Sequence, residues 1–257
     1  GDLTHARTNV EDALAAFRAS RTLRTLDGCN ALILHGSILV DQGKPARGLR
    51  VFEEAVRTAE REGLDAALGR AYAGIGRSHA AARHFNRAID ALQRARDTLQ
   101  TAEENAALGS VMHQLGRLQL DAGHLDAAQE SLERGMQVLQ DGDPGLRTDS
   151  LTDLARAQLR AGRIVQAQNT ARSALALAGQ GDEPGRRGRA LVMLGMTARA
   201  QRRTKSAVEY LKEAVTLLRK GRLQAELAEA TRELDTLLKE KSPAGGPAES
   251  RLAGTTR

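Results

Sequence analysis

The chain has 257 residues, a formal net charge of +6 and 41% hydrophobic residues, with no Trp, two Tyr and three Phe. Ala and Leu dominate its apolar side chains, which favours helices over strands, because strands draw on β-branched and aromatic residues. The single cysteine, Cys29, excludes an internal disulfide. No apolar run is as long as a membrane span, which needs about 20 residues. We therefore expect a soluble, cytoplasmic protein.

Residues 1–22 are expected to form one amphipathic helix. Gly1, Ala6, Val10 and Ala13 follow one another at intervals of five, four and three residues, the same intervals that recur in the second half of each later repeat. We therefore interpret this segment as the second half of a truncated repeat. Because the chain begins with glycine rather than methionine, we also expect a larger parent protein.

Residues 27–240 contain a recurring pattern of small and apolar residues. The pattern begins with a Gly, often preceded by Leu, and continues with a second Gly. From this second Gly, an Ala, a large apolar residue and another Ala follow at intervals of five, four and three residues. Such intervals place the apolar residues on one helical face, and the small residues allow two helices to cross closely. The five copies are Gly36–Gly43–Gly48–Phe52–Ala55, Gly69–Gly76–Ala81–Phe85–Ala88, Gly116–Gly123–Ala128–Leu132–Gly135, Ala155–Gly162–Ala167–Ala171–Ala174 and Gly195–Arg202–Ala207–Leu211–Ala214.

This pattern resembles that of the tetratricopeptide repeat family. The resemblance implies an all-α, right-handed superhelical solenoid of antiparallel helix pairs, with five repeats in residues 27–240. The repeat starts at 36, 69, 116, 155 and 195 are spaced 33, 47, 39 and 40 residues apart, against the usual 34 of the family. We therefore expect lengthened helices and longer links.

The C-terminal part of the solenoid is predicted to be a capping helix at residues 223–240. Five leucines are expected to face inward and to cover the last repeat: Leu223, Leu227, Leu234, Leu237 and Leu238. Residues 241–257 lack apolar periodicity and are expected to form a disordered tail.

No motif for catalysis or for metal binding is present. Ser37 and Ser110 each follow a glycine, but they lie within helical repeats rather than at a strand-to-helix turn. His79 and His84 are five residues apart, which does not place their rings together on one helix face. The glycine-rich segment 179–188 follows a helix and lacks a Gly-Lys-Ser/Thr ending. We expect no enzyme activity, no cofactor and no metal.

A partner-binding groove is the function that the resemblance implies. In this family, first helices line the concave face, and the residue after the crossing glycine points into it. The corresponding positions here are Ser37, Arg70, Arg117, Arg156 and Met196, and the neighbouring basic side chains are His113, Arg160, Arg189 and Arg199. Arginine forks suit carboxylates, so an acidic or C-terminal segment of a protein or peptide is the expected ligand. The alternative is that these arginines only solvate a surface.

A second basic patch surrounds the last repeat and comprises Arg186, Arg187, Arg202, Arg203 and Lys205. This patch could alternatively bind nucleic acid. That interpretation is disfavoured, because no aromatic residues lie between the basic ones to stack on bases. A homodimer through the open face of the truncated repeat is a further alternative.

The Ala/Arg/Leu-rich composition is similar to that of scaffold or sensor arms in larger bacterial regulators from high-GC genomes. We therefore expect the regulatory or partner-recognition region of a protein such as a transcriptional regulator. The competing hypothesis is a stand-alone assembly adaptor.

Overall fold

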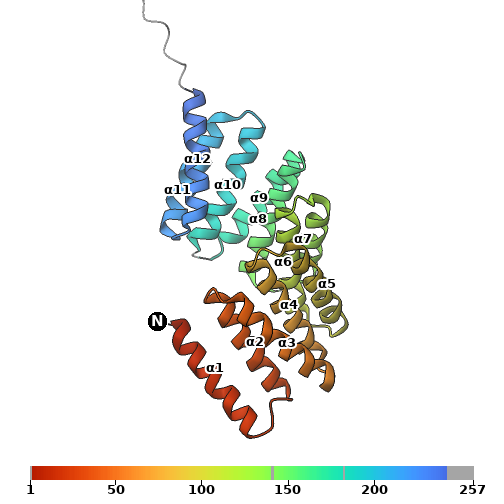
Figure 1. The fold of residues 1–257 in the computed structure, drawn as a ribbon. Helices are drawn as coiled ribbons and strands as arrows, with labels where there is room; N and C mark the ends of the chain where they lie inside the picture. Colours follow the sequence, from red (N-terminus) through yellow and green to blue (C-terminus); the bar gives the residue numbers. More distant parts are fainter. Residues whose placement is uncertain (1, 140–141, 182, 242–257) are drawn as a thin grey trace, which may run out of the picture.

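The computed structural model describes residues 2–139, 142–181 and 183–241, which form twelve α-helices and no strand (Figure 1). This confirms the predicted all-α repeat solenoid. The helices are α1 (Asp2–Ala19), α2 (Leu26–Asp41), α3 (Pro45–Glu62), α4 (Asp65–Ala81), α5 (Phe85–Thr101), α6 (Asn105–Asp121), α7 (Leu125–Val138), α8 (Pro144–Arg160), α9 (Ile164–Ala178), α10 (Pro184–Ala200), α11 (Thr204–Lys220) and α12 (Gln224–Lys241).

Five helix pairs, from α2–α3 to α10–α11, lie between the single helices α1 and α12. The first helices also pack from repeat to repeat: α2 on α4, α6 on α8 and α8 on α10. The stack of helices is curved, so that α1 and α12, at its two ends, lie on the same side of the molecule (Figure 1). Residues 242–257 of the expected tail lie outside the described residues.

Four of the five repeats close at a glycine on the first helix that meets a large side chain 16 residues later on the second helix. A Cβ atom on Gly76 would lie 2.7 Å from Leu92, and one on Gly116 would lie 2.6 Å from Leu132. Gly36 meets Phe52 and Gly195 meets Leu211 in the same way. Real Cβ atoms do not approach so closely, and the absence of a side chain therefore allows the two helices to touch.

These contacts correct the predicted repeat starts. The equivalent positions are 36, 76, 116, 155 and 195, which are 40, 40, 39 and 40 residues apart. The start assigned to Gly69, and with it the uneven spacing of 33 and 47, is wrong. Gly69 belongs to another crossing one heptad earlier, where a Cβ atom would lie 2.5 Å from Leu99.

The turns between paired helices show the same register. Gly43, Gly123 and Gly162 have φ angles of 73°, 84° and 76°, in the left-handed region that glycine adopts at little steric cost. Arg83 and Arg202 take this position in the other two repeats, with φ angles of 61° and 59°. The predicted replacement of the turn glycine by Arg202 is confirmed, whereas the second repeat turns at Arg83 rather than at Gly76.

Helix α12 covers the last repeat with one face. Leu237 is 1% exposed and packs in a cluster with Ala198, Ala207 and Leu211, while Leu234 is partly buried beside them. Leu238 is 40% exposed, so its predicted inward position is wrong. Adjacent residues on a helix point about 100° apart, and the shallow contact surface buries only one of the two.

Candidate partner-binding groove

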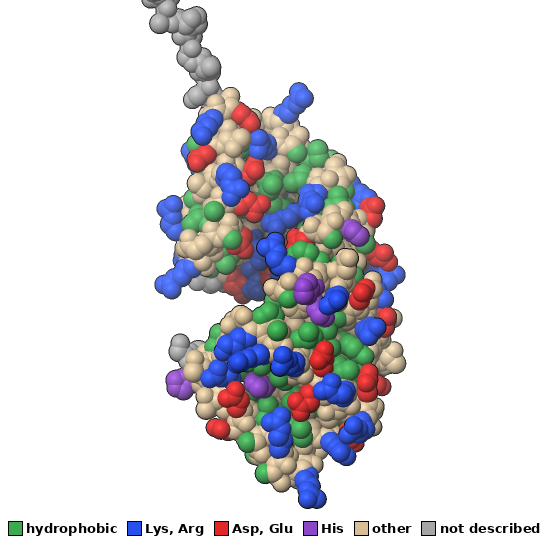
Figure 2. Space-filling view, in the orientation of Figure 1, with side chains coloured by type: hydrophobic (Ala, Val, Ile, Leu, Met, Phe, Trp, Pro, Cys, Tyr) green, Lys and Arg blue, Asp and Glu red, His purple; other side chains and the backbone are tan. Residues whose placement is uncertain are grey.

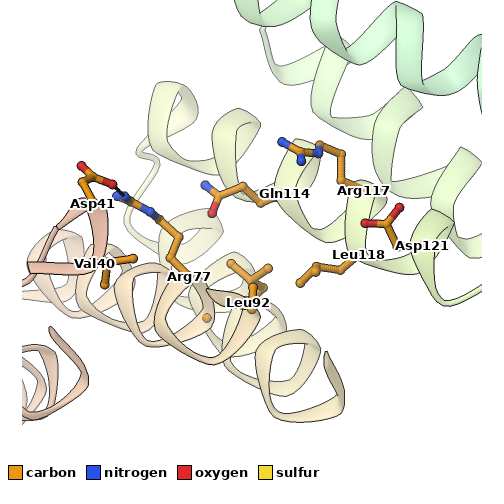
Figure 3. A pocket seen from close by; sticks show the side chains of 10 residues that line it. Val40, Asp41, Arg77, Leu92, Gln114, Arg117, Leu118 and Asp121 are labelled. Atoms are coloured by element: carbon orange, nitrogen blue, oxygen red, sulfur yellow. Dashed lines mark hydrogen bonds and ion pairs between the residues drawn. The ribbon is translucent and has the colours of Figure 1, made fainter. Parts of the chain in front are cut away.

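A cavity of about 500 Å³ opens between α4 and α6 (Figure 3). Its wall combines apolar groups from α2, α4, α5 and α6 with charged and amide side chains. The lining residues are Val40, Asp41, Gly76, Arg77, Ala80, Leu92, Gln114, Arg117, Leu118 and Asp121. Pockets that combine an apolar wall with a few polar groups are typical ligand sites.

The two arginines of this cavity differ in how strongly they are held. Arg77 donates a hydrogen bond from Nη2 to Asp41 Oδ1 at 2.8 Å and a longer one from Nη1 to Ser37 Oγ at 3.4 Å. The side chain of Arg117 is 59% exposed, and its nearest carboxylate oxygen, on Asp153, is 3.9 Å from Nε. Figure 3 shows Arg77 reaching toward Asp41, with Arg117 on the far wall. Arg117 therefore remains available to an acidic group.

The corrected register changes the row of groove residues. The residues after the crossing positions are Ser37, Arg77, Arg117, Arg156 and Met196. Arg70 lies seven residues before Arg77 and forms an ion pair with Glu104 at 3.8 Å. Sequence reasoning therefore missed Arg77, although the 40-residue period of the crossing glycines points to it.

His113 differs from its expected position on the groove surface. It is 8% exposed and lies between α6 and α8, where its Nδ1 is 3.1 Å from Ser150 Oγ. Burial lowers the pKa of His113, although the nearby Asp153 carboxylate acts in the opposite direction. The ring is therefore neutral at pH 7 and serves as a buried polar link between two repeats.

Ser150, His113 and Asp153 are the residue types of a hydrolytic triad, but their geometry does not support catalysis. Ser150 is 1% exposed on the middle of a helix, and His113 Nε2 is 3.9 Å from Asp153 Oδ2. A substrate carbonyl could not reach the buried hydroxyl. Burial, followed by the charge of Glu62, raises the pKa of the Cys29 thiol, which disfavours its nucleophilic thiolate form.

The remaining predicted groove residues contact neighbouring helices of the chain itself. Arg156 is 3.8 Å from Glu229 of α12, and Arg160 donates to the backbone oxygen of Leu120 at 2.6 Å. Arg189 binds Asp149 at 2.9 Å. Arg199 binds both Glu233 and Glu240 of α12, at 2.6 and 2.9 Å.

Figure 2 shows basic side chains in the hollow with acidic ones beside them. The groove surface is therefore mixed rather than uniformly basic, because most of its arginines have a carboxylate partner in a neighbouring helix.

The second basic patch is divided in the same way. Arg186 binds Asp149 at 3.2 Å and also pairs with Glu183. Arg202, Arg203 and Lys205 are exposed, and no ion pair found in the described chain involves them. Arg187 is partly buried and also lacks an ion pair there, so four basic side chains of this patch have no carboxylate partner among the described residues.

The described residues contain neither a metal-binding cluster nor a membrane-spanning helix. No group of three or more His, Cys, Asp or Glu side chains is arranged to hold a metal ion. None of the described helices combines the length and the apolar character that crossing a bilayer requires.

Two stretches of the chain are similar to a known repeat family. Residues 33–75 and 152–222 match the model of the tetratricopeptide repeat. No curated protein sequence matches the chain.

Among solved structures, the sensor-containing signal-transduction ATPase PH0952 of Pyrococcus horikoshii has a TM-score of 0.73 at 14% identity, covering 95% of this chain and 39% of that one. BtubC of P. vanneervenii has a TM-score of 0.67 at 13% identity over the whole of both chains. The Cut9-Hcn1 structure has a TM-score of 0.67 at 17% identity, covering 92% of this chain and 41% of that one.

The chain thus spans about two fifths of the matched chain in two of these three structures. At such identities the likeness concerns the fold. Together with the five helix pairs and their crossing residues, these matches show that the chain has the fold of a tetratricopeptide-like helical solenoid.

Proposed function

We propose that the chain recognises an extended segment of a partner protein on its inner face, anchored in the cavity between α4 and α6. The observation that carries this proposal is the mixed wall of that cavity. Val40 and Leu118, which are partly exposed, offer apolar surface for one side chain of the segment. Arg117, which is largely exposed, stands beside them.

The partner segment is expected to carry an acidic residue next to an apolar one. Arg117 can donate two parallel hydrogen bonds to a carboxylate, and its present carboxylate neighbour is 3.9 Å away. Gln114 donates from Nε2 to Ser110 at 3.3 Å, and its amide oxygen can accept a bond from the backbone of an extended segment. Because Arg77 is already bound to Asp41, it shapes the wall more than it attracts charge.

We further propose that this recognition of a partner segment serves regulation within a larger protein. The similar chain of PH0952 belongs to a signal-transduction ATPase with a tetratricopeptide repeat sensor, and YrrB, at a TM-score of 0.54 and 18% identity, is a repeat protein with an unusual peptide-binding site. Both support a recognition role for this chain. A stand-alone adaptor is the second candidate, favoured by the end-to-end match with BtubC.

The test is selection of binding peptides from a displayed random library, followed by affinity measurement. For a selected peptide, Arg117→Glu is expected to raise the Kd at least tenfold, which corresponds to about 1.4 kcal/mol. Ala80→Phe, which fills the cavity, should do the same. The matched control is Arg172→Glu, an equal charge change on the exposed surface of α9. Unchanged affinity in both cavity variants, with helical circular dichroism intact, would refute the proposal.

A further inference from the structure

A second cavity, of about 480 Å³, lies at the other end of α2. Four arginines line it: Arg18 at the end of α1, Arg21 and Arg24 in the α1–α2 link, and Arg61 in the last turn of α3. Helix α2 has 16 residues, so it separates this cavity from the α4–α6 cavity by about 24 Å along its axis. The two sites can therefore be altered independently.

Most of these arginines lack an acidic partner, unlike those of the groove. Arg18 is 3.5 Å from Glu54. The ion pairs of the described chain include none with Arg21, Arg24 or Arg61, and none with Glu62, the one acidic residue of the cavity wall. Three exposed arginines thus line one cavity without an ion pair among the described residues.

The turn that carries Arg21 and Arg24 is firmly packed. Leu23, between them, packs against the cluster that contains Val10, Leu14 and Leu32. Gly28 lies so close to this turn that a Cβ atom there would be 2.3 Å from the Leu23 oxygen. Because the turn is anchored in this way, the backbone that carries Arg21 and Arg24 is in place beside the cavity before any ligand binds, which lowers the entropic cost of binding.

We propose that this cavity binds the phosphoryl group of a phosphorylated side chain in a partner protein. A phosphate monoester carries close to two negative charges and three acceptor oxygens, which match several converging guanidinium groups better than a single carboxylate does. The cavity also offers Leu23 and Thr58 beside the arginines, giving contact surface to the residues that flank the phosphorylated one.

A nucleic acid fits this cavity less well. Strands of nucleic acid bind along extended basic tracks with aromatic side chains for base stacking. The chain has only two Tyr and three Phe, and none of them lines this cavity. A compact group of arginines suits one phosphoryl group instead.

The experiment compares three degenerate peptide libraries on the immobilised protein. Their fixed central residue is phosphoserine, serine or glutamate. The wild-type protein is expected to retain the phosphoserine library at least tenfold better than the other two. The variant Arg21→Gln/Arg24→Gln/Arg61→Gln should lose this preference. A control with the same charge change, Arg172→Gln/Arg219→Gln/Arg222→Gln, alters exposed arginines elsewhere and should keep it.

A gain-of-binding variant makes the test independent of folding. Glu62→Gln removes the one carboxylate of the wall and should increase retention of the phosphoserine library several-fold. Equal retention by the wild type and the cavity variant would overturn the proposal. So would equal retention of the glutamate library, or complete competition by a DNA or RNA strand that binds the cavity variant poorly. Arg117→Glu, which tests the groove, should leave this binding unchanged.

Discussion

At the scale of single residues, the crossing positions come in complementary pairs. The small residue of the first helix and its partner on the second are Gly36 with Phe52, Gly76 with Leu92, Gly116 with Leu132, Ala155 with Ala171, and Gly195 with Leu211. Where the first helix carries alanine instead of glycine, the partner is alanine instead of a large residue. The fourth repeat thus shows that two small side chains can also form this crossing, without a glycine on the first helix.

This complementarity predicts the effect of Gly116→Ala. A Cβ atom there would lie 2.6 Å from Leu132, so the free energy of unfolding should fall by about 1–3 kcal/mol, although alanine favours the helix by about 1 kcal/mol. Urea unfolding followed by circular dichroism measures the change. In a cycle with Leu132→Ala, the double variant should lose less stability than the sum of the single variants. Gly181→Ala, with no atom within 4 Å of its Cβ, is the control; an additive cycle would contradict this explanation.

Residue-scale reasoning from the sequence succeeded for the pattern and failed for its register in one repeat. Gly69 and Gly76 are seven residues apart, so both lie on the same helical face and both fit the position of a crossing glycine. The turn that follows Gly76 would distinguish the two, but its left-handed residue, with a φ angle of 61°, is Arg83. Because this residue is an arginine rather than a glycine, the sequence does not mark the turn. The error moved the expected groove arginine from Arg77 to Arg70.

At the scale of elements, α12 closes the stack because α10 and α11 would otherwise present apolar side chains to water. The leucine pattern correctly predicted a helix here. It could not show which of two adjacent leucines is buried, because that depends on the angle at which the helix lies on its neighbours. The structure buries Leu237 and leaves Leu238 at 40% exposure.

The two neighbours supply a matched pair of variants. Leu237→Ala should lower the free energy of unfolding by about 2–5 kcal/mol, whereas Leu238→Ala should change it by less than about 0.5 kcal/mol. Because each repeat contacts only its neighbours, the loss is expected to be local. Hydrogen exchange should show reduced protection in α10–α12 and unchanged protection in α2–α5. Loss of protection along the whole chain in Leu237→Ala would show that the repeats unfold as one unit.

At the scale of the whole molecule, hydrogen-bonded ion pairs join successive repeats. They connect residues 34–41 positions apart, as in Arg77 with Asp41, Arg163 with Asp126 and Arg199 with Glu233 and Glu240. Sequence reasoning found Arg199 but neither Arg77 nor Arg163, and it found none of the acidic partners, because the pairing depends on how one repeat is rotated against the next. The expected basic groove is for this reason a surface of mixed charge.

Asp149 offers the clearest test of whether these pairs set the curvature of the solenoid. Its carboxylate binds Arg186 and Arg189 of the next repeat at 3.2 and 2.9 Å. Asp149→Asn should lower the free energy of unfolding by only about 1 kcal/mol, because the groups are partly exposed to solvent. Small-angle X-ray scattering should nevertheless show a larger radius of gyration, since α8 and α10 lose their charged link. Glu130→Gln, which breaks an exposed pair within α7, should leave the scattering unchanged. If Asp149→Asn also leaves it unchanged, the curvature follows from apolar helix packing alone, and the arginines serve the groove surface rather than its shape.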